Sequence, residues 1–391
     1  MTRTARISLA SLTLWLFAGT LIGLFLAYPT SKIIGDIRYP LELTVAVVVA
    51  AAVVQDSRCL RATAVTLRLS LWVSALLTLS ASAGLLVLSG RSEAASLISD
   101  GGGAAQRFLT SATFFALATV CFCLARALVL KRGLDSWSWW LPGILIVLLA
   151  FSRNHVLAVG VALTLAICVA SWATLPRILI AALASVSLYW VMFIVLPPTI
   201  DDLPIGNWYA AQIGGYADRV IEGLNPSVRS ADPSARYRTS EIVYLGRAFS
   251  DSIFVGHGFG FPYQPPVLSK SGDFWLDRAR YYSHNFYWWT AAKTGLLGLT
   301  TIAVAFGWPM VRGLRSTSST VRCGAVALGA ALAVSYLAPL PLDTPGTLVV
   351  GGLLGLVLGW IPAKTQPITI GLERLPHPTS PSTESVDVDK L

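Results

Sequence analysis

Apolar runs separated by short polar turns recur along almost the whole chain. Most of these runs reach the roughly 17 to 25 residues that an α-helix needs to cross the hydrocarbon of a membrane. The pattern therefore predicts an all-α polytopic integral membrane protein. In chain order, the predicted spans are 7–28, 38–54, 69–89, 108–130, 137–151, 155–173, 177–197, 286–310, 322–340 and 346–361. The count is about ten transmembrane helices, or twelve if 140–197 divides differently.

The spans divide the chain into four parts. An N-terminal transmembrane bundle (1–197) is followed by one large polar loop (198–285), by C-terminal transmembrane helices (286–361) and by a tail (362–391). The tail is rich in proline and serine and is predicted to be disordered. The loop is far longer than a connector needs to be, and loops beyond about 15 residues are usually functional or disordered. Its many aromatic residues and near-balanced charge argue against disorder.

Part of this loop carries signals for regular structure. Asp232 is placed as the N-cap of a helix and Pro233 as its first residue. Apolar residues then recur at helical spacing from Ile242 to Phe249, so we expect this helix to lie against the membrane or the bundle. The glycine- and proline-rich stretch 255–266 predicts a shaped loop rather than a helix or strand.

Composition supports a membrane location. Of the residues, 54% are hydrophobic and only 13% are charged, whereas a soluble domain carries about 25% charged residues. The net charge of +9 is spread over short turns, as the positive-inside rule predicts, so we expect no nucleic-acid partner. The turns rich in arginine and lysine mark the cytoplasmic side, together with both chain ends. Segment 198–285 and the turn at Arg153 then face the exported side.

Three sequence motifs follow one another in and around the exported loop. "FSRNHVLAVGVAL" (151–163) contains a Ser-Arg turn that opens a span. "RYRTSEIVYLGRAFSDSIFVGHGFG" (236–260) joins an arginine-led helix to a Gly-x-Gly-x-Gly loop. In "HNFYWWTAAKTGLLG" (284–298), a His-Asn pair precedes Gly-x-x-Gly by nine residues. Over roughly 150 to 300 the chain resembles the O-antigen ligase family of the O-antigen ligase and polymerase superfamily.

This resemblance implies a glycosyltransferase of the membrane-embedded GT-C type. The enzyme would lie in the bacterial inner membrane, with its active site facing the periplasm. It would transfer a glycan from an undecaprenyl-pyrophosphate donor to lipid A–core oligosaccharide in lipopolysaccharide biosynthesis. We expect neither a metal ion nor another cofactor. The lipid tail of the donor would lie in a groove between spans, in contact with membrane lipid.

The residues suit this chemistry. His284 is the candidate general base, because an imidazole titrates near neutral pH. Arg153 and Arg238 are the candidate pyrophosphate clamps, because guanidinium groups hold phosphate oxygens in forked hydrogen bonds. The register of the arginine-led helix could slip by two, so Arg236 stays an alternative to Arg238. Read without the motif, His284 could instead anchor a helix end at the membrane interface, and Arg153 could snorkel to it.

Further residues are assigned supporting positions. Asn285 belongs to the His-Asn pair, and His257 lies in the glycine-rich loop, where it is a candidate for the lining of the site. Gly295 and Gly298 are interpreted as helix-packing residues, since small side chains allow helices to approach closely in a bilayer. Lys293 lies inside a predicted span, where an unpaired cation is costly, and the sequence identifies no partner for it.

Two alternatives share the same donor chemistry. An O-antigen polymerase would extend the glycan on its lipid carrier, and a protein O-oligosaccharyltransferase would use a serine or threonine as acceptor. The non-enzyme alternative is a transporter of lipid-linked glycans. Transporters tend to place ionisable residues near the middle of the bilayer, whereas the candidate residues here gather at one face.

Overall fold

Helices form most of the structure. The computed structural model describes residues 2–86, 91–94, 106–130, 137–170, 206–221, 233–268, 275–276 and 280–361, together with single positions at 176, 183, 187, 190, 191, 195, 196 and 225. Within these ranges the strands form two short antiparallel pairs, β1 with β2 and β3 with β4. The predicted helical class is therefore confirmed for the described parts of the chain.

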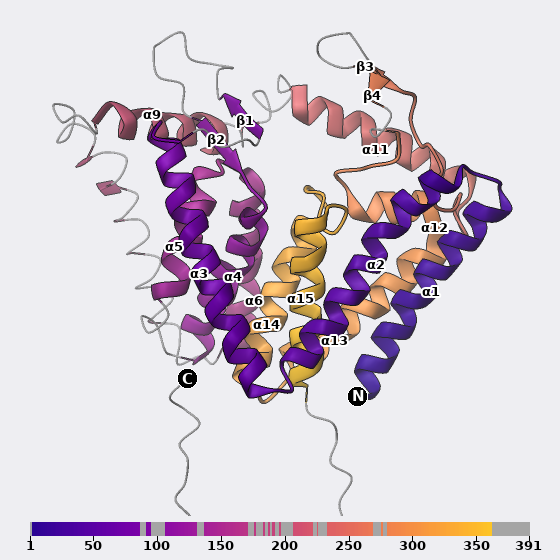
Figure 1. Cartoon of the computed structure of the whole chain (residues 1–391), viewed down its shortest axis with the longest axis horizontal. Helices are drawn as coiled ribbons and strands as arrows, with labels where there is room; N and C mark the ends of the chain where they lie inside the picture. The colour runs from indigo at the N-terminus through magenta and orange to yellow at the C-terminus, as the bar shows by residue number, and fades with distance from the viewer. Residues whose placement is uncertain are drawn as a thin grey trace, which may run out of the picture.

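The elements follow one another as α1 (Arg3–Phe25), α2 (Thr30–Val53), α3 (Ser57–Ser82), β1 (Arg91–Ala94), β2 (Gln106–Leu109), α4 (Ala112–Leu130), α5 (Trp137–Leu149), α6 (Arg153–Val169), α9 (Gly206–Tyr216), the π-helical turn η3 (Ala217–Ile221), α11 (Pro233–Asp251), β3 (Val267–Leu268), β4 (Trp275–Leu276), α12 (Phe286–Ile302), the π-helical turn η6 (Ala303–Gly307), α13 (Trp308–Leu314), α14 (Ser319–Val334) and α15 (Thr344–Trp360). The apolar helices stand side by side, and α9 and α11 lie across one end of the bundle (Figure 1). We call this end the upper end.

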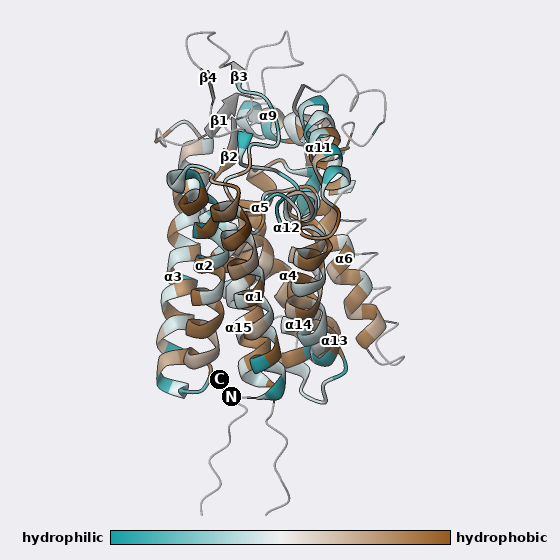
Figure 2. Cartoon of the chain, turned by 90° about the vertical axis from the view of Figure 1, so that its right-hand side faces the viewer, coloured by the Kyte–Doolittle hydropathy of each residue, from teal (hydrophilic) through white to brown (hydrophobic). Residues whose placement is uncertain are grey.

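The apolar helices have the dimensions of membrane spans. Among the described residues, four helical segments are long and apolar enough to cross a membrane: Arg3–Phe25, Ser57–Ser82, Ala112–Val129 and Phe286–Leu314. Shorter apolar helices accompany them. Hydrophobic residues predominate along the middle of the helices, and hydrophilic residues are more frequent toward the ends of the bundle (Figure 2). On α1, Phe17 is 60% exposed and Leu24 is 52% exposed. Such contiguous apolar surface fits lipid rather than water, and the chain is a multi-pass membrane protein.

Most predicted spans correspond to helices. Every predicted span except 177–197 overlaps a helix of the structure, and 177–197 lies outside the described residues apart from single positions. The count of ten or twelve therefore stays a prediction, as does the assignment of the two membrane faces. Helix α2 begins eight residues before its predicted span, because its polar first turns continue the helix beyond the apolar run. The tail 362–391 and Asp232 also lie outside the described residues.

The structure of the large loop agrees with two of its sequence signals. Helix α11 begins at Pro233, as predicted, and packs along α12. Leu245 on α11 is completely buried. The stretch 255–266 contains neither helix nor strand. The prediction of a shaped loop is therefore confirmed.

Helix α12 is interrupted at Gly295, whose backbone has φ 62° and ψ −156°. In an unbroken helix the carbonyls of Ala292 and Lys293 would accept hydrogen bonds from amides four residues later. Instead, the Ala292 carbonyl accepts from the amide of His257 at 3.0 Å. The Lys293 carbonyl accepts from the amide of Gly258 at 2.7 Å. The glycine-rich loop thus supplies the donors that the break removes.

Carbonyl groups just before the glycine-rich loop accept hydrogen bonds from the amides that follow the break. The amide of Leu296 donates to the carbonyl of Ile253 at 2.8 Å, and the amide of Leu297 donates to that of Phe254 at 3.0 Å. Non-helical backbone at membrane depth is tolerated where protein groups satisfy it. The break removes two helical hydrogen bonds from α12. The chain after α11 provides a new partner for each of the two carbonyls and two amides that had formed them.

Glycine is required on both sides of this junction. Gly295 has φ 62°, and a Cβ atom there would lie 2.5 Å from the backbone carbonyl of Phe254. Gly256 has φ 65°, and a Cβ atom there would lie 2.5 Å from the backbone of Lys293. Both a left-handed conformation and close backbone contact exclude a side chain. This explains the glycines of both motifs.

The side chain of Phe259 fixes the loop against α1. Its amide donates to the carbonyl of Gly19 at 2.8 Å. Its ring lies over Gly19, and its backbone lies against Gly23 of the same helix. The ring stacks on Trp289, with centroids 5.7 Å apart, and is completely buried. Phe259 therefore joins α1 to α12 through the loop.

A buried ion pair adds α2 to this assembly. The Nζ of Lys293 lies 2.6 Å from Oδ2 of Asp36 and 2.6 Å from the carbonyl oxygen of Phe261. The amide of Gly260 donates to the same Asp36 oxygen at 2.7 Å. Lys293 is completely buried, so removal of either charged partner would leave an uncompensated charge. Asp36 is the partner that sequence analysis could not identify for Lys293.

We expect Gly295→Ala to destabilise the protein, because it strains a positive φ and pushes a methyl group into the backbone of Phe254. The expected loss is about 1–3 kcal/mol, measured as a lower midpoint of thermal unfolding of the purified protein in detergent. Gly307→Ala is the matched control in the same helical run, since a Cβ atom at Gly307 would meet no atom within 4 Å. Equal unfolding midpoints for the two variants would contradict this account of the break.

Candidate functional site

His284 lies in a short extended segment just before α12. Asn285 is the N-cap of α12, and its side-chain oxygen accepts a hydrogen bond from the Trp288 amide at 3.1 Å. The amide of Phe286 donates to the Ser335 carbonyl at 3.0 Å. These contacts fix the residue preceding the cap, so the side chain of His284 projects from the start of α12 at the upper end.

A buried carboxylate holds His284 from the side of α11. Oε2 of Glu241 accepts the backbone amide of His284 at 3.1 Å and lies 3.4 Å from its Nδ1. Oε1 of Glu241 accepts the hydroxyl of Tyr263 at 2.9 Å. The Glu241 side chain is 1% exposed, whereas that of His284 is 25% exposed. The carboxylate is thus enclosed, and the imidazole reaches the surface of the site.

This contact favours one tautomer of His284. A carboxylate only accepts hydrogen bonds, so the nitrogen that faces Glu241 is the one that carries the hydrogen. Nε2 then keeps its lone pair and can accept a proton from a bound hydroxyl group. The separation of 3.4 Å is long for a hydrogen bond, as is common for catalytic contacts before substrate binds. The predicted general base His284 thus has a buried carboxylate beside Nδ1 that can orient its ring.

Aromatic side chains restrain the imidazole. The rings of Tyr237 and Tyr282 meet His284 edge to face, with centroids 6.0 Å and 5.5 Å away. Tyr263 also donates its hydroxyl to the Tyr282 carbonyl at 2.6 Å. Burial, and then the nearby charge of Glu241, raise the pKa of the Tyr263 hydroxyl above its ordinary value. It therefore stays a hydrogen-bond donor to the carboxylate at neutral pH.

The candidate clamp residues of α11 differ in their surroundings. Arg238 is half-buried and lies three residues before Glu241, which places both on one side of α11. Arg236 is exposed. Arg238 is therefore the arginine that shares its helix side with the carboxylate of the His284 site.

Arg153 reaches the upper end from α6, where it is the first helical residue and is half-buried. The side-chain amide of its neighbour Asn154 donates to the Leu337 carbonyl at 3.3 Å. The loop between α14 and α15 thereby links the start of α6 to the start of α12, which bonds to Ser335. Ser335 and Leu337 are two residues apart, which corresponds to at most about 7 Å. The starts of α6 and α12 therefore both bond to one short stretch of this loop.

The other candidate residues make packing and hydrogen-bond contacts within the fold. Asn285 is buried as the cap of α12, and Gly295 forms the break described above. Gly298 lies against the side chain of Thr294 on the same helix. The ring of His257 stacks on Phe261 at 4.1 Å, and its Nε2 lies 2.8 Å from the Ala248 carbonyl oxygen. These positions support the junction of loop and helix.

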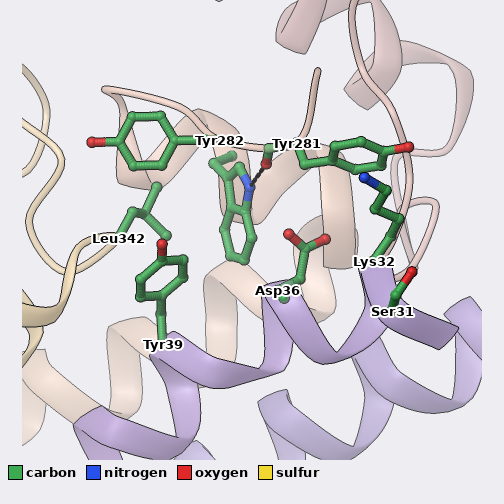
Figure 3. A pocket seen from close by; sticks show the side chains of 9 residues that line it. Ser31, Lys32, Asp36, Tyr39, Tyr281, Tyr282 and Leu342 are labelled. Atoms are coloured by element: carbon green, nitrogen blue, oxygen red, sulfur yellow. Dashed lines mark hydrogen bonds between the residues drawn. The ribbon is translucent and has the colours of Figure 1, made fainter. Parts of the chain in front are cut away.

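A cavity of about 270 Å³ opens beside the His284 segment. It is lined from three sides: by the first turns of α2, by the segment before α12 with Trp289, and by the loop after α14. Figure 3 shows the rings of Tyr39, Tyr281 and Tyr282 around it, with the carboxylate of Asp36 directed toward its centre. Tyr282 lines this cavity and also contacts the ring of His284.

Sequence analysis did not single out Glu241, Tyr263 or Asp36. The available signal for Glu241 was its position three residues after Arg238, on the same side of the loop helix. The signal for Asp36 was weaker: a buried lysine needs a carboxylate, and α2 contains two acidic residues near its predicted membrane entry. Tyr263 gave no signal, because its role depends on contacts with residues far away in the sequence.

Comparison with protein families agrees with the resemblance seen in the motifs. Residues 139–303 match a family model described as O-Antigen ligase. The match runs from α5 to the end of α12 and includes Arg153, Arg238 and His284. No curated protein matches the chain.

Proposed function

We propose that this chain, a member of the O-antigen ligase family, transfers a glycan from undecaprenyl pyrophosphate to the lipid A–core oligosaccharide of lipopolysaccharide. The observation that carries the proposal is the pairing of His284 with the buried carboxylate of Glu241. A base oriented in this way is suited to activating a sugar hydroxyl. In this proposal the chain is a GT-C enzyme of the inner membrane, and its upper end faces the periplasm.

The reaction is an in-line displacement at the anomeric carbon of the donor. The acceptor hydroxyl oxygen forms a bond to that carbon while Nε2 of His284 takes the hydroxyl proton. The bond between the anomeric carbon and the pyrophosphate oxygen breaks, and its electron pair leaves with undecaprenyl pyrophosphate. Attack opposite the leaving group inverts the configuration.

The protein stabilises both charges that develop, the positive charge on the His284 imidazole and the negative charge on the leaving pyrophosphate. Glu241 stabilises the imidazolium that forms on His284, as carboxylates do in other base-orienting pairs. Arg153 and Arg238 hold the leaving pyrophosphate, whose negative charge rises as the bond breaks. Of the two candidate arginines on α11, Arg236 and Arg238, we assign this role to Arg238, because it shares the helix side of Glu241.

The proposal predicts that purified protein transfers glycan from the undecaprenyl-pyrophosphate donor to rough lipopolysaccharide, and that His284→Gln lowers this rate at least about 100-fold. Product is measured as a ladder on lipopolysaccharide in gels. Longer lipid-linked chains with bare lipopolysaccharide would indicate a polymerase instead. No glycan movement by folded wild-type protein would contradict enzyme function and favour transport.

Glu241→Gln tests the positioning role. Glutamine has the same shape: its oxygen can accept the His284 amide, and its NH2 can donate to the Tyr263 hydroxyl, which keeps the Tyr282 carbonyl as its own acceptor. The unfolding midpoint should therefore stay within a few degrees. The loss of charge beside Nδ1 should lower kcat by about tenfold or more while KM changes little. Glu42→Gln, at a half-buried carboxylate of α2 that pairs with Arg38, is the control. A Glu241→Gln enzyme with normal kcat would remove the carboxylate from the mechanism.

Arg238→Lys should lower kcat about tenfold, because lysine cannot form a forked contact with two phosphate oxygens. Arg247→Lys is the control, since Arg247 is exposed on the same helix. Transfer rates of these two variants and of Arg236→Lys decide the register of the clamp. A loss confined to Arg236→Lys would transfer the role to that residue.

A further inference from the structure

We infer that the cavity beside Tyr282 is a binding subsite for a single pyranose ring of a substrate glycan. This inference rests on the proposed glycosyl transfer and extends it to the part of the site that recognises sugar. The lining of the cavity combines aromatic faces with a few polar groups, as is typical of pockets for small ligands. Four of its residues are aromatic: Tyr39, Tyr281, Tyr282 and Trp289.

The carboxylate of Asp36 supplies an acceptor inside this cavity. The hydrogen bonds from the Lys293 ammonium and from the Gly260 amide both go to Oδ2. Oδ1 is left for a ligand, and the carboxylate points into the cavity (Figure 3). Because a carboxylate accepts and does not donate, the ligand group opposite Asp36 must be a donor. A sugar hydroxyl meets this requirement.

Charge disfavours a cation in the cavity and an anion at the position opposite Asp36. A quaternary ammonium group would need free aromatic faces, but Nζ of Lys32 lies 4.8 Å from the centroid of Tyr281, and Nζ of Lys293 lies 5.6 Å from that of Trp289. Both ammonium groups would repel a further cation. A phosphate group opposite Asp36 would face a carboxylate, which repels an anion and donates no hydrogen bond to it. A neutral ligand with several hydroxyl groups fits both constraints.

The position of the cavity connects it to the reaction. Tyr282 lines the cavity and also contacts the ring of His284, with centroids 5.5 Å apart. Lys32 and Ser31 bring further donors from the start of α2. A sugar bound here would therefore lie next to the reacting hydroxyl or the reacting anomeric carbon. The sugar can belong to the acceptor or to the donor, and the experiment below separates these sources.

Gly35 offers a way to close the cavity without disturbing the fold. It lines the cavity from α2, and a Cβ atom there would meet no atom within 4 Å. Gly35→Leu therefore places a side chain in the empty space without a backbone clash. Gly352→Leu on α15 is the matched control, because a Cβ atom at Gly352 also meets no atom within 4 Å and Gly352 does not line the cavity. Tyr39→Leu is a second variant, which removes one aromatic face.

The test measures KM for rough lipopolysaccharide and for the lipid-linked donor in the transfer reaction. We expect Gly35→Leu and Tyr39→Leu to raise one of these constants at least tenfold, with kcat within about threefold of wild type and Gly352→Leu unchanged. A rise in the acceptor constant assigns the subsite to the acceptor, and a rise in the donor constant assigns it to the donor. If both constants stay within twofold in both cavity variants, the subsite does not exist.

A binding measurement separates this inference from the proposed function. Delipidated core oligosaccharide and delipidated donor glycan are each titrated into full-length protein, and saturation-transfer NMR detects binding. We expect one of them to bind to wild type and to His284→Gln, and to lose binding in Gly35→Leu. Binding of this kind without transfer by wild type would keep the subsite and refute the transferase. Transfer by wild type with unaltered binding in Gly35→Leu would keep the transferase and refute the subsite.

Discussion

The break in α12 at Gly295 is the constraint on which the rest of the upper end depends. Backbone groups released inside an apolar bundle must find partners in the protein, because lipid offers none. The loop that follows α11 provides them, by inserting between the two carbonyls before the break and the two amides after it. Gly256 of the loop and Gly295 of α12 stand where the two backbones touch.

This junction sets the geometry of the His284 site. Leu296 follows His284 by twelve residues, and its partner Ile253 follows Glu241 by the same number. The segments 241–253 and 284–296 therefore contain the same number of residues and are connected at both ends. Glu241 bonds to His284 at one end, and backbone hydrogen bonds connect them at the helix break at the other. This gives a physical reason for the nine residues that separate the His-Asn pair from Gly-x-x-Gly in this chain. A change in that separation would move the imidazole away from Glu241.

The same loop carries stabilising contacts in two further directions. Phe259 joins it to α1, and Asp36 of α2 takes both the ammonium of Lys293 and the amide of Gly260. A buried ion pair adds little net stability over apolar packing, but it penalises any arrangement that separates its charges. The pair therefore specifies the position of α2 relative to α12. The cavity beside Tyr282 lies between these elements, so the interactions that define the fold also shape the space next to His284.

The sequence by itself determined the helical membrane class, the start of α11 at Pro233, the irregular loop 255–266 and the family resemblance carried by the motifs. Hydropathy and local backbone preferences are properties of short segments, which explains this success. The helical extent of α2 exceeded its apolar run, because hydropathy marks the lipid-exposed part of a helix and not its polar first turns. Only the tertiary structure decided that Glu241 faces His284, that Asp36 neutralises Lys293 and that the glycines serve a helix break. Each of these pairs residues that are distant in the chain, and such pairing is a property of the packed molecule alone.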